Sequence, residues 1–344
     1  MPKIDTLDTQ ALTPYLEAHI AGFKGLLRTD KFGGGQSNPT FHLYASSGEY
    51  VLRRQPPGAL LKSAHAVDRE FRAMSALAAT DVPVPKMCHL CTDTGVIGSM
   101  FYVMEFCRGR VLWDPALPEV EAPIRAAMYD EMNRVLAALH AVDVEAVGLG
   151  DYGHAGSYFQ RQVTRWSKQY RASELTHIVA MEDLTAWLAN HLPPDDGQIS
   201  LVHGDYNINN LIWHPEQPRI IAVIDWELST LGHPLADLAY QCMRMRAPTL
   251  PGSGLDSLYG RDRHALGIPT EAEYVAAYCR RRGLPHAAHW AFCLAFNFFR
   301  LAAIAQGIAK RVQQGNASSR HAEWAAPAVS MLAQAGLDIA NGGA

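Results

Sequence analysis

The 344-residue sequence lacks a long uninterrupted apolar run, which argues against a membrane span. Its most apolar stretches, Trp290–Phe299 and Leu301–Ala305, are interrupted by Asn297 and Arg300, whereas a transmembrane helix needs about 20 consecutive apolar residues. Met1–Thr13 also lacks the basic segment followed by an apolar run that marks a secretory signal. We therefore expect a soluble protein of the cytoplasm, with no membrane partner.

The sequence also has little excess of either charge and few cysteines. Its 30 basic and 34 acidic side chains give a net charge of −4, which leaves no strong positive field for binding nucleic acid. The six cysteines are scattered, and a chain that is 48% hydrophobic can form a core without disulfides. Cys88 and Cys91 form a CxxC pair, but no second pair completes a zinc site, so we interpret them as ordinary apolar side chains.

What the sequence does contain is a change of hydrophobic period along the chain. After a predicted helix over residues 6–19, the segment Lys31–Arg54 alternates around a glycine turn and a Ser-Ser-Gly turn, which predicts antiparallel strands. His65–Ala79 carries apolar residues at helical spacing, with Glu70 beside the apolar stripe. Met100–Phe106 is typical of a buried strand.

The rest of the chain is predicted to be mainly helical, beginning with an amphipathic helix through Met128–His140. Three short strand-like runs interrupt it: Ser200–Asp205, Asn210–Trp213 and Arg219–Asp225. We therefore predict an α+β fold with two lobes. An N-terminal antiparallel-sheet lobe would cover residues 1–107, and a larger, mainly helical lobe would cover residues 108–344.

The spacing of polar residues in those three runs is typical of phosphoryl transfer. His203-x-Asp205-x-x-x-x-Asn210 has the spacing of a kinase catalytic loop, in which the aspartate accepts the substrate proton and the asparagine coordinates a metal ion. Asp225 ends an apolar strand 15 residues after Asp205, where a kinase places its metal-binding aspartate. Carboxylate and amide oxygens suit Mg²⁺.

His203–Asn210 followed by Ile224–Glu227 resembles the aminoglycoside phosphotransferase and choline kinase superfamily, which shares the protein-kinase core. Three further segments are similar to the kinase-like domain that is fused to some mammalian acyl-CoA dehydrogenases: Phe32–Thr40, Tyr50–Gly58 and Asp81–Pro85. The dehydrogenase part itself has no room in 344 residues. The resemblance implies a two-lobed protein-kinase-like fold with ATP and Mg²⁺ as cofactors.

The resemblance also implies roles for residues of the C-terminal lobe. Asp205 would be the catalytic base, Asn210 and Asp225 would bind magnesium, His203 would orient the catalytic loop, and Glu227 would assist near the metal ion. Isolated histidines and aspartates in loops are more often caps or turn formers, but here several positions match together. Asp237 also matches a position of this superfamily, and we expect its side chain to have a structural role.

A glycine-rich turn lies at the start of the predicted sheet. Gly33, Gly34 and Gly35 allow backbone N–H groups to approach phosphate closely, and Ser37 and Asn38 offer further donors. We predict that all five contribute to ATP binding. A plain hairpin turn is the alternative interpretation.

The strand after this turn carries Arg53 where a protein kinase has lysine, and Glu70 is its expected ion-pair partner. A guanidinium is a planar fork and an ammonium is a compact charge, so this departure changes the phosphate contact. A purely structural ion pair is the alternative. The adjacent Arg54 is expected to face solvent. The backbone from Glu105 to Cys107 would contact the adenine of ATP in the hinge between the lobes.

The resemblance indicates a phosphotransferase acting on a small-molecule hydroxyl, with a hydroxyacyl-CoA or hydroxy acid as acceptor. Arg280–Arg282 or Lys310–Arg311 would bind the phosphates of such a CoA thioester, unless they are solvated faces. The alternatives are an aminoglycoside or choline-type kinase, a non-catalytic module that binds nucleotide or acyl-CoA, and a metal-dependent hydrolase. The sequence does not specify an oligomeric state.

Overall fold

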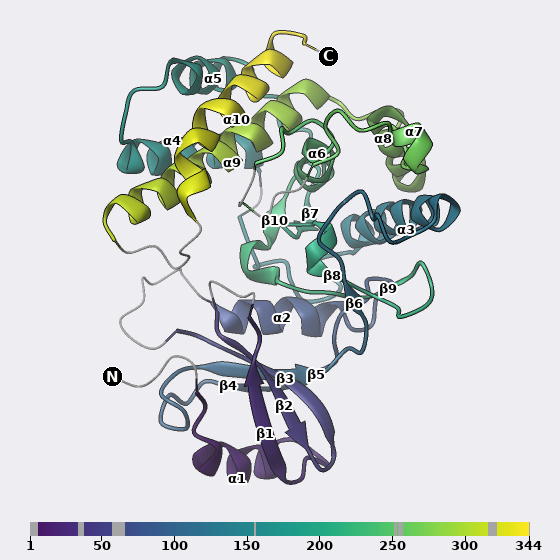
Figure 1. Ribbon diagram of the computed structural model, residues 1–344, viewed down its shortest axis with the longest axis vertical. Coiled ribbons are helices and arrows are strands. Elements are labelled where there is room, and N and C mark those ends of the chain that lie inside the picture. Colours follow the sequence, from purple (N-terminus) through teal and green to yellow (C-terminus); the bar gives the residue numbers. More distant parts are fainter. Residues whose placement is uncertain are drawn as a thin grey trace.

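The computed structural model describes residues 6–33, 38–56, 66–154, 156–250, 253, 257–315 and 322–343. Within these residues, a five-stranded antiparallel sheet lies at one end of the molecule and a larger group of helices at the other (Figure 1). The predicted α+β architecture, with a sheet lobe followed by a helical lobe, is confirmed.

The N-terminal sheet has the strand order β1-β2-β3-β5-β4. Its strands are β1 (Leu26–Lys31), β2 (Thr40–Ala45), β3 (Gly48–Arg54), β4 (Met87–Cys91) and β5 (Phe101–Glu105). Two helices accompany it, α1 (Thr9–His19) and α2 (Val67–Leu77). Both helices and the strands of the glycine-turn region were predicted, whereas β4 was not.

The two faces of this sheet belong to different cores. Successive residues of a strand point to opposite faces. Phe101 and Val103 of β5 pack in a core with α1, and Tyr102 and Met104 pack with α2 in the core that continues into the helical lobe. The buried side of α2, which carries Glu70, therefore lies where the two lobes meet.

The C-terminal lobe is built from long helices around two small sheets. Its helices are α3 (Ala122–Ala141), α4 (Tyr158–Ser173), α5 (Val179–Asn190), α6 (Leu235–Met243), α7 (Arg263–Leu266), α8 (Glu271–Arg282), α9 (Trp290–Gln313) and α10 (Ala325–Ala340). The sheet β6-β8-β9 consists of β6 (Arg110–Val111), β8 (Leu211–Trp213) and β9 (Ile220–Val223), and the other pairs β7 (Ser200–Val202) with β10 (Thr230–Gly232). Both sheets lie between α2 and the larger helices (Figure 1).

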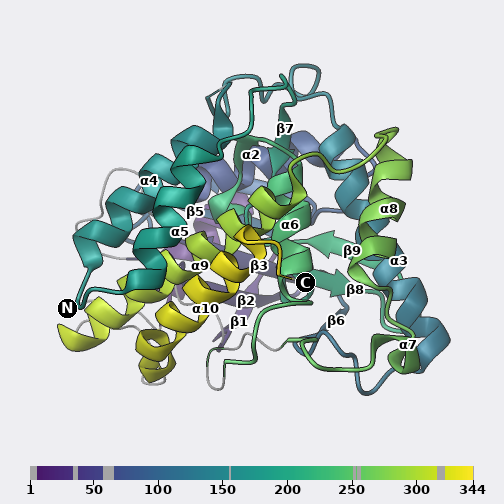
Figure 2. The same cartoon turned by 90° about the horizontal axis from the view of Figure 1, so that it is seen from above.

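Helix α9 is long and apolar enough, by length and composition alone, to cross a membrane. In this fold, however, 78% of its apolar window is buried inside the protein. It packs against α4, α6 and α10, and it runs beside α10 in both views (Figures 1 and 2). This is the environment of a helix in the core of the fold.

One of two neighbouring arginines, Arg54, differs from expectation. Arg54, expected to face solvent, is only 4% exposed, and its guanidinium lies 5.6 Å from the centre of the Phe41 ring. Burial lowers the pKa of Arg54. Because consecutive strand residues point to opposite faces and this sheet is covered on both, neither Arg53 nor Arg54 can face open solvent.

Candidate active site

The predicted catalytic loop begins where β7 ends, and Asp237 of α6 holds its backbone. The Asp237 carboxylate accepts hydrogen bonds from the N–H groups of His203, at 2.6 Å, and Gly204, at 2.9 Å. Gly204 has φ +82°, and a Cβ there would lie 2.6 Å from the backbone oxygen of Leu228. The loop therefore requires glycine at this position and an acceptor at Asp237, which gives Asp237 the structural role expected for it.

His203 is fully buried and connects the two polar segments of the site. Its Nε2 lies 3.0 Å from the backbone oxygen of Ile224, and its Nδ1 lies 3.2 Å from the backbone nitrogen of Asp205. Because one neighbour is an acceptor and the other a donor, the neutral tautomer with hydrogen on Nε2 satisfies both. This side chain thus links the loop to the segment that carries Asp225.

Asp205 projects from this loop with a donor on each carboxylate oxygen. Tyr240 on α6 donates to Oδ1 at 2.6 Å, and the Asn210 side chain donates to Oδ2 at 2.9 Å. Desolvation raises the pKa of Asp205, although the hydrogen bond from Tyr240 acts in the opposite direction. A carboxylate with a raised pKa is a stronger base than an ordinary aspartate.

Strand pairing brings Asn210 and Asp225 together. Leu211 of β8 pairs with Val223 of β9, and the Ile224 N–H donates to the Asn210 backbone oxygen at 3.0 Å. Asp225 follows directly with φ +65°, an uncommon left-handed conformation for a residue other than glycine. Asp225 then precedes the short helix Trp226–Leu228. The register of two short strands thus places both predicted metal ligands at one end of the sheet.

Arg53 of β3 joins the sheet lobe to this segment through three acidic residues. Its Nη2 lies 2.6 Å from Asp225 Oδ1 and 3.3 Å from Glu227 Oε2, and its Nε lies 3.2 Å from Glu70 Oε2. The last contact is an ion pair without the angle of a good hydrogen bond. The predicted Arg53–Glu70 pair is therefore present, and it extends across the interface between the lobes.

Glu70 is completely buried and has neutral donors as well as Arg53. Asn38 donates to Oε1 at 3.0 Å, and Tyr102 donates to Oε2 at 3.2 Å. Burial raises the pKa of Glu70 to about 7, with the charge of Arg53 opposing that rise. Asn38, predicted to donate to phosphate, is fully buried and instead supports this carboxyl group.

The site has the donor set that a magnesium ion requires. Asn210 uses its side-chain nitrogen on Asp205, which leaves its amide oxygen as a ligand, and Asp225 contributes carboxylate oxygens. Glu70, Asp225 and Glu227 surround the Arg53 guanidinium, which gives this group more carboxyl groups than one guanidinium can neutralise. Residues of this kind fit a divalent cation accompanied by phosphate.

The structure describes only some of the other residues predicted to contact the nucleotide. Gly34, Gly35 and Ser37 lie outside the described residues, and Gly33 is exposed with open space around it. In the hinge, the Glu105 N–H donates to the Lys86 oxygen and the Phe106 N–H to the Glu49 oxygen. Among the described residues, no acceptor bonds the N–H of Cys107.

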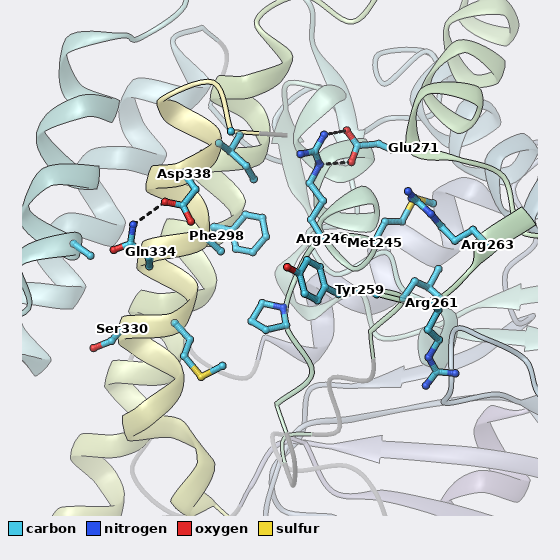
Figure 3. Close-up of a pocket in the computed structure, with 18 of the residues that line it drawn as sticks. Met245, Arg246, Tyr259, Arg261, Arg263, Glu271, Phe298, Ser330, Gln334 and Asp338 are labelled. Atoms are coloured by element: carbon cyan, nitrogen blue, oxygen red, sulfur yellow. Dashed lines mark hydrogen bonds and ion pairs between the residues drawn. The ribbon is translucent and has the colours of Figure 1, made fainter.

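A cavity of about 920 Å³ lies between α9 and α10 on one side and residues 245–248 and 258–263 on the other (Figure 3). Its charged lining residues are Arg246, Arg261, Arg263, Glu271 and Asp338. Arg246 forms a two-bonded ion pair with Glu271, at 2.6 and 3.1 Å, and Gln334 donates to Asp338 at 2.7 Å. Both acids in the lining therefore already have donors.

This cavity is near the catalytic loop without including its acids. Asp205, Asn210 and Asp225 are not among the described residues that line it. Met245 and Leu258 line both the cavity and a small space that also touches the catalytic loop. Met245 follows the C-terminal end of α6, the helix that carries Tyr240.

Comparison with known proteins agrees with this geometry. Residues 29–292, well over half of the chain, match the model of the phosphotransferase enzyme family. The chain belongs to this family. Mouse acyl-CoA dehydrogenase family member 10 is 46% identical over 345 residues, which cover 98% of this phosphotransferase and 32% of the mouse protein. The chain thus spans about a third of the length of that relative.

Solved structures place the phosphotransferase in the same fold. A candidate aminoglycoside phosphotransferase from Ralstonia eutropha JMP134 shares 49% identity, with a TM-score of 0.89 over 98% of this chain and 99% of that one. Spectinomycin phosphotransferase, solved with ADP and spectinomycin, is 11% identical with a TM-score of 0.63, covering 96% of this chain and 98% of that one. The predicted kinase-like fold and superfamily are therefore confirmed.

Sequence reasoning missed two residues that contact the catalytic loop of this phosphotransferase. Tyr240 bonds Asp205, and Arg300 of α9 donates to the Gly204 oxygen at 2.6 Å. Both lie in apolar helical segments where an aromatic or a single arginine has no distinctive spacing. Only the packing of α6 and α9 against the loop identifies them.

Proposed function

We propose that this phosphotransferase transfers the terminal phosphoryl group of ATP, with Mg²⁺, to a hydroxyl group of a small molecule. The supporting observation is the meeting of Asp205, Asn210, Asp225 and Arg53 where the sheet lobe contacts the helical lobe. Phosphoryl transfer requires little more than positioning and charge neutralisation, and these groups supply both. We further propose a lobe boundary at residue 107 and a cytoplasmic location.

The residues would divide the work as follows. The Asp205 carboxylate would orient the acceptor hydroxyl and take its proton as the new O–P bond forms and the bond to ADP breaks. Asn210 and Asp225 would hold Mg²⁺, which neutralises phosphate charge when bound. Arg53 would turn from Asp225 to the phosphates while keeping Glu70 as its partner. Glu227 would support the metal site.

The nucleotide would lie beneath the glycine turn and against the hinge. Gly33, Gly34, Gly35 and Ser37 would surround the phosphates with backbone and hydroxyl donors. In the hinge, the N–H of Cys107 would contact adenine, together with the backbone oxygen of Glu105. Asn38 would act indirectly, by holding Glu70.

We assign the acceptor to the cavity beside α6 and expect it to be anionic. Both acids of the lining are already engaged and Arg261 pairs with Asp114 at 3.6 Å, so Arg263 is the residue that adds positive charge. A carboxylate or phosphate of the acceptor fits this charge, whereas a polycationic aminoglycoside does not. A hydroxy acid or hydroxyacyl-CoA is therefore favoured over an aminoglycoside or choline.

Two of the basic residues expected to bind a CoA phosphate already have structural contacts. Arg281 bonds Asn133 and Asp130, and Lys310 donates to the Ala172 oxygen at 2.6 Å, so both have structural contacts. Arg280 lines a second cavity of about 550 Å³ that shares Arg246 and Glu271 with the acceptor cavity. Within Arg280–Arg282, we therefore propose that Arg280 binds a phosphate group of CoA.

The decisive experiment incubates the purified chain with Mg-ATP and hydroxyacyl-CoAs, hydroxy acids, choline or an aminoglycoside. ADP formation and the phosphorylated product are measured together, so that ATP hydrolysis is separated from transfer. We expect product from an anionic hydroxy compound. ATP binding without product from any acceptor would instead favour the non-catalytic binding module.

Metal binding provides an independent test. Mn²⁺ substitutes for Mg²⁺ at oxygen sites and can be followed by electron paramagnetic resonance. In the presence of a non-hydrolysable ATP analogue, Asp225→Asn should weaken Mn²⁺ binding about tenfold, while Asp151→Asn on the surface should not. Equal Mn²⁺ affinity in both variants would remove Asp225 from the metal site.

A further inference from the structure

We infer that Tyr240 is a positioning residue that fixes the plane of the Asp205 carboxylate for proton transfer. This inference deepens the proposed function and rests on it. The Tyr240 hydroxyl donates to Asp205 Oδ1 at 2.6 Å, from a helix that is separate from the catalytic loop. The side chain is only 8% exposed, so water does not readily replace it.

The two donors on Asp205 act as a pair. Asn210 bonds Oδ2 at 2.9 Å and also bonds the Asp205 backbone oxygen at 2.9 Å, which ties one edge of the carboxylate to its own loop. Tyr240 ties the opposite edge to α6. A carboxylate held at both oxygens cannot rotate freely about its Cβ–Cγ bond, and its remaining lone pairs keep a fixed direction toward an acceptor hydroxyl.

Tyr240 is itself held in place by charge and packing. Burial raises the pKa of Tyr240 above its ordinary range, so the hydroxyl keeps its proton and remains a donor. The Arg300 guanidinium lies 5.5 Å from the centre of its ring and donates to the Gly204 oxygen in the catalytic loop. Arg300 therefore contacts both Tyr240 and the catalytic loop that carries Asp205.

The test is Tyr240→Phe, which removes the hydroxyl and keeps the ring and its contact with Arg300. We expect kcat for transfer to the acceptor to fall about tenfold, with the KM values for ATP and acceptor changed less than about twofold. Tyr274→Phe is the matched control, because that buried hydroxyl donates at 2.6 Å to Gln241, the residue after Tyr240. The control should keep the wild-type kcat.

Each possible result either supports or overturns the positioning role of Tyr240. A wild-type kcat in Tyr240→Phe, an equal loss in both variants, or a rise in KM alone would overturn the inference. If the wild-type protein phosphorylates no acceptor, the proposed function fails, and proton NMR then tests the contact itself. A strongly downfield hydroxyl signal should be absent from Tyr240→Phe and Asp205→Ala and present in Tyr274→Phe. Its absence from the wild-type spectrum would overturn the inference.

Discussion

Two aspartates, Asp205 in the catalytic loop and Asp237 on α6 beside it, illustrate how the same side chain serves opposite purposes. Around Asp237, burial is outweighed by hydrogen bonds from His140 and from backbone N–H groups, which hold its pKa below the usual range. Around Asp205, desolvation prevails over the Tyr240 bond and raises the pKa. The comparison teaches that the number of donors, more than depth of burial, decides whether an aspartate is a fixed anion or a base.

Asp237 and Asp205 also differ in the charges and donors that surround their carboxylates. Asp237 faces His140 and the backbone nitrogens of His203 and Gly204, all of which are donors or carry positive potential. Asp205 has the negative charge of Asp225 nearby, which makes its own ionisation less favourable. We therefore expect substitutions at Asp237 to act on stability and substitutions at Asp205 to act on turnover.

The largest effect should come from Asp205→Asn. Loss of the proposed base should lower kcat by about 10³-fold, while nucleotide affinity stays within about twofold. Thermal stability should stay the same or rise, because a desolvated charge is replaced by a neutral amide. Steady-state kinetics, nucleotide titration and calorimetric melting measure these quantities. Acceptor-dependent turnover that survives the change would refute the assignment of Asp205 as base.

Asp237→Asn should show the reverse pattern. The amide cannot accept all three hydrogen bonds without presenting its NH₂ group to a donor, and we expect a loss of about 3 kcal/mol in the free energy of unfolding. Urea denaturation measures this loss. Asp151→Asn is the control, because the Asp151 side chain is 77% exposed and its loss should leave the urea midpoint unchanged.

The stability difference between the wild-type protein and Asp237→Asn should depend on pH. A depressed folded-state pKa contributes stability above the pKa of the unfolded chain, and that contribution is lost as the pH falls through the folded value. The wild-type protein should therefore lose its advantage over Asp237→Asn as the pH falls below the ordinary aspartate range. A stability difference that stays constant down to the pH of acid unfolding would contradict this assignment.

Arg53→Ala should have an effect of intermediate size on both stability and ATP binding. It leaves Glu70 buried beside neutral donors only, and we expect a loss of about 2 kcal/mol in stability together with about tenfold weaker ATP binding. The surface pair Arg108–Glu49 provides the control, since the Arg108 side chain is 76% exposed. ATP affinity equal to that of Arg108→Ala would leave the Arg53 pair with a structural role alone.

The smallest effect should come from the acceptor cavity. Arg263→Gln removes one positive charge from its lining, and we expect the KM of an anionic acceptor to rise about threefold to tenfold with kcat nearly unchanged. The KM for ATP serves as the internal control. A lower acceptor KM would show that the acceptor is cationic, and this result would favour the aminoglycoside alternative.

Much of the fold was readable in the sequence because its signals are local. Helical spacing with Glu70 beside the apolar stripe predicted α2, and the motif spacing predicted the segments that bring Asn210 and Asp225 together. The strand β4 was missed, because its short run around Cys88 and Cys91 has no clean alternation. Tyr240 was missed for another reason, since its role depends on how α6 packs against the catalytic loop.

The contact between Arg53 and Asp225 has a consequence for the order in which ligands enter. The Asp225 carboxylate is the partner of the Arg53 guanidinium and also the proposed ligand of a divalent ion. Free magnesium would compete with the Arg53 guanidinium for Asp225, whereas the triphosphate of ATP would offer Arg53 a replacement anion. Metal and nucleotide should consequently arrive as one species, and the empty enzyme should discriminate against bare cations.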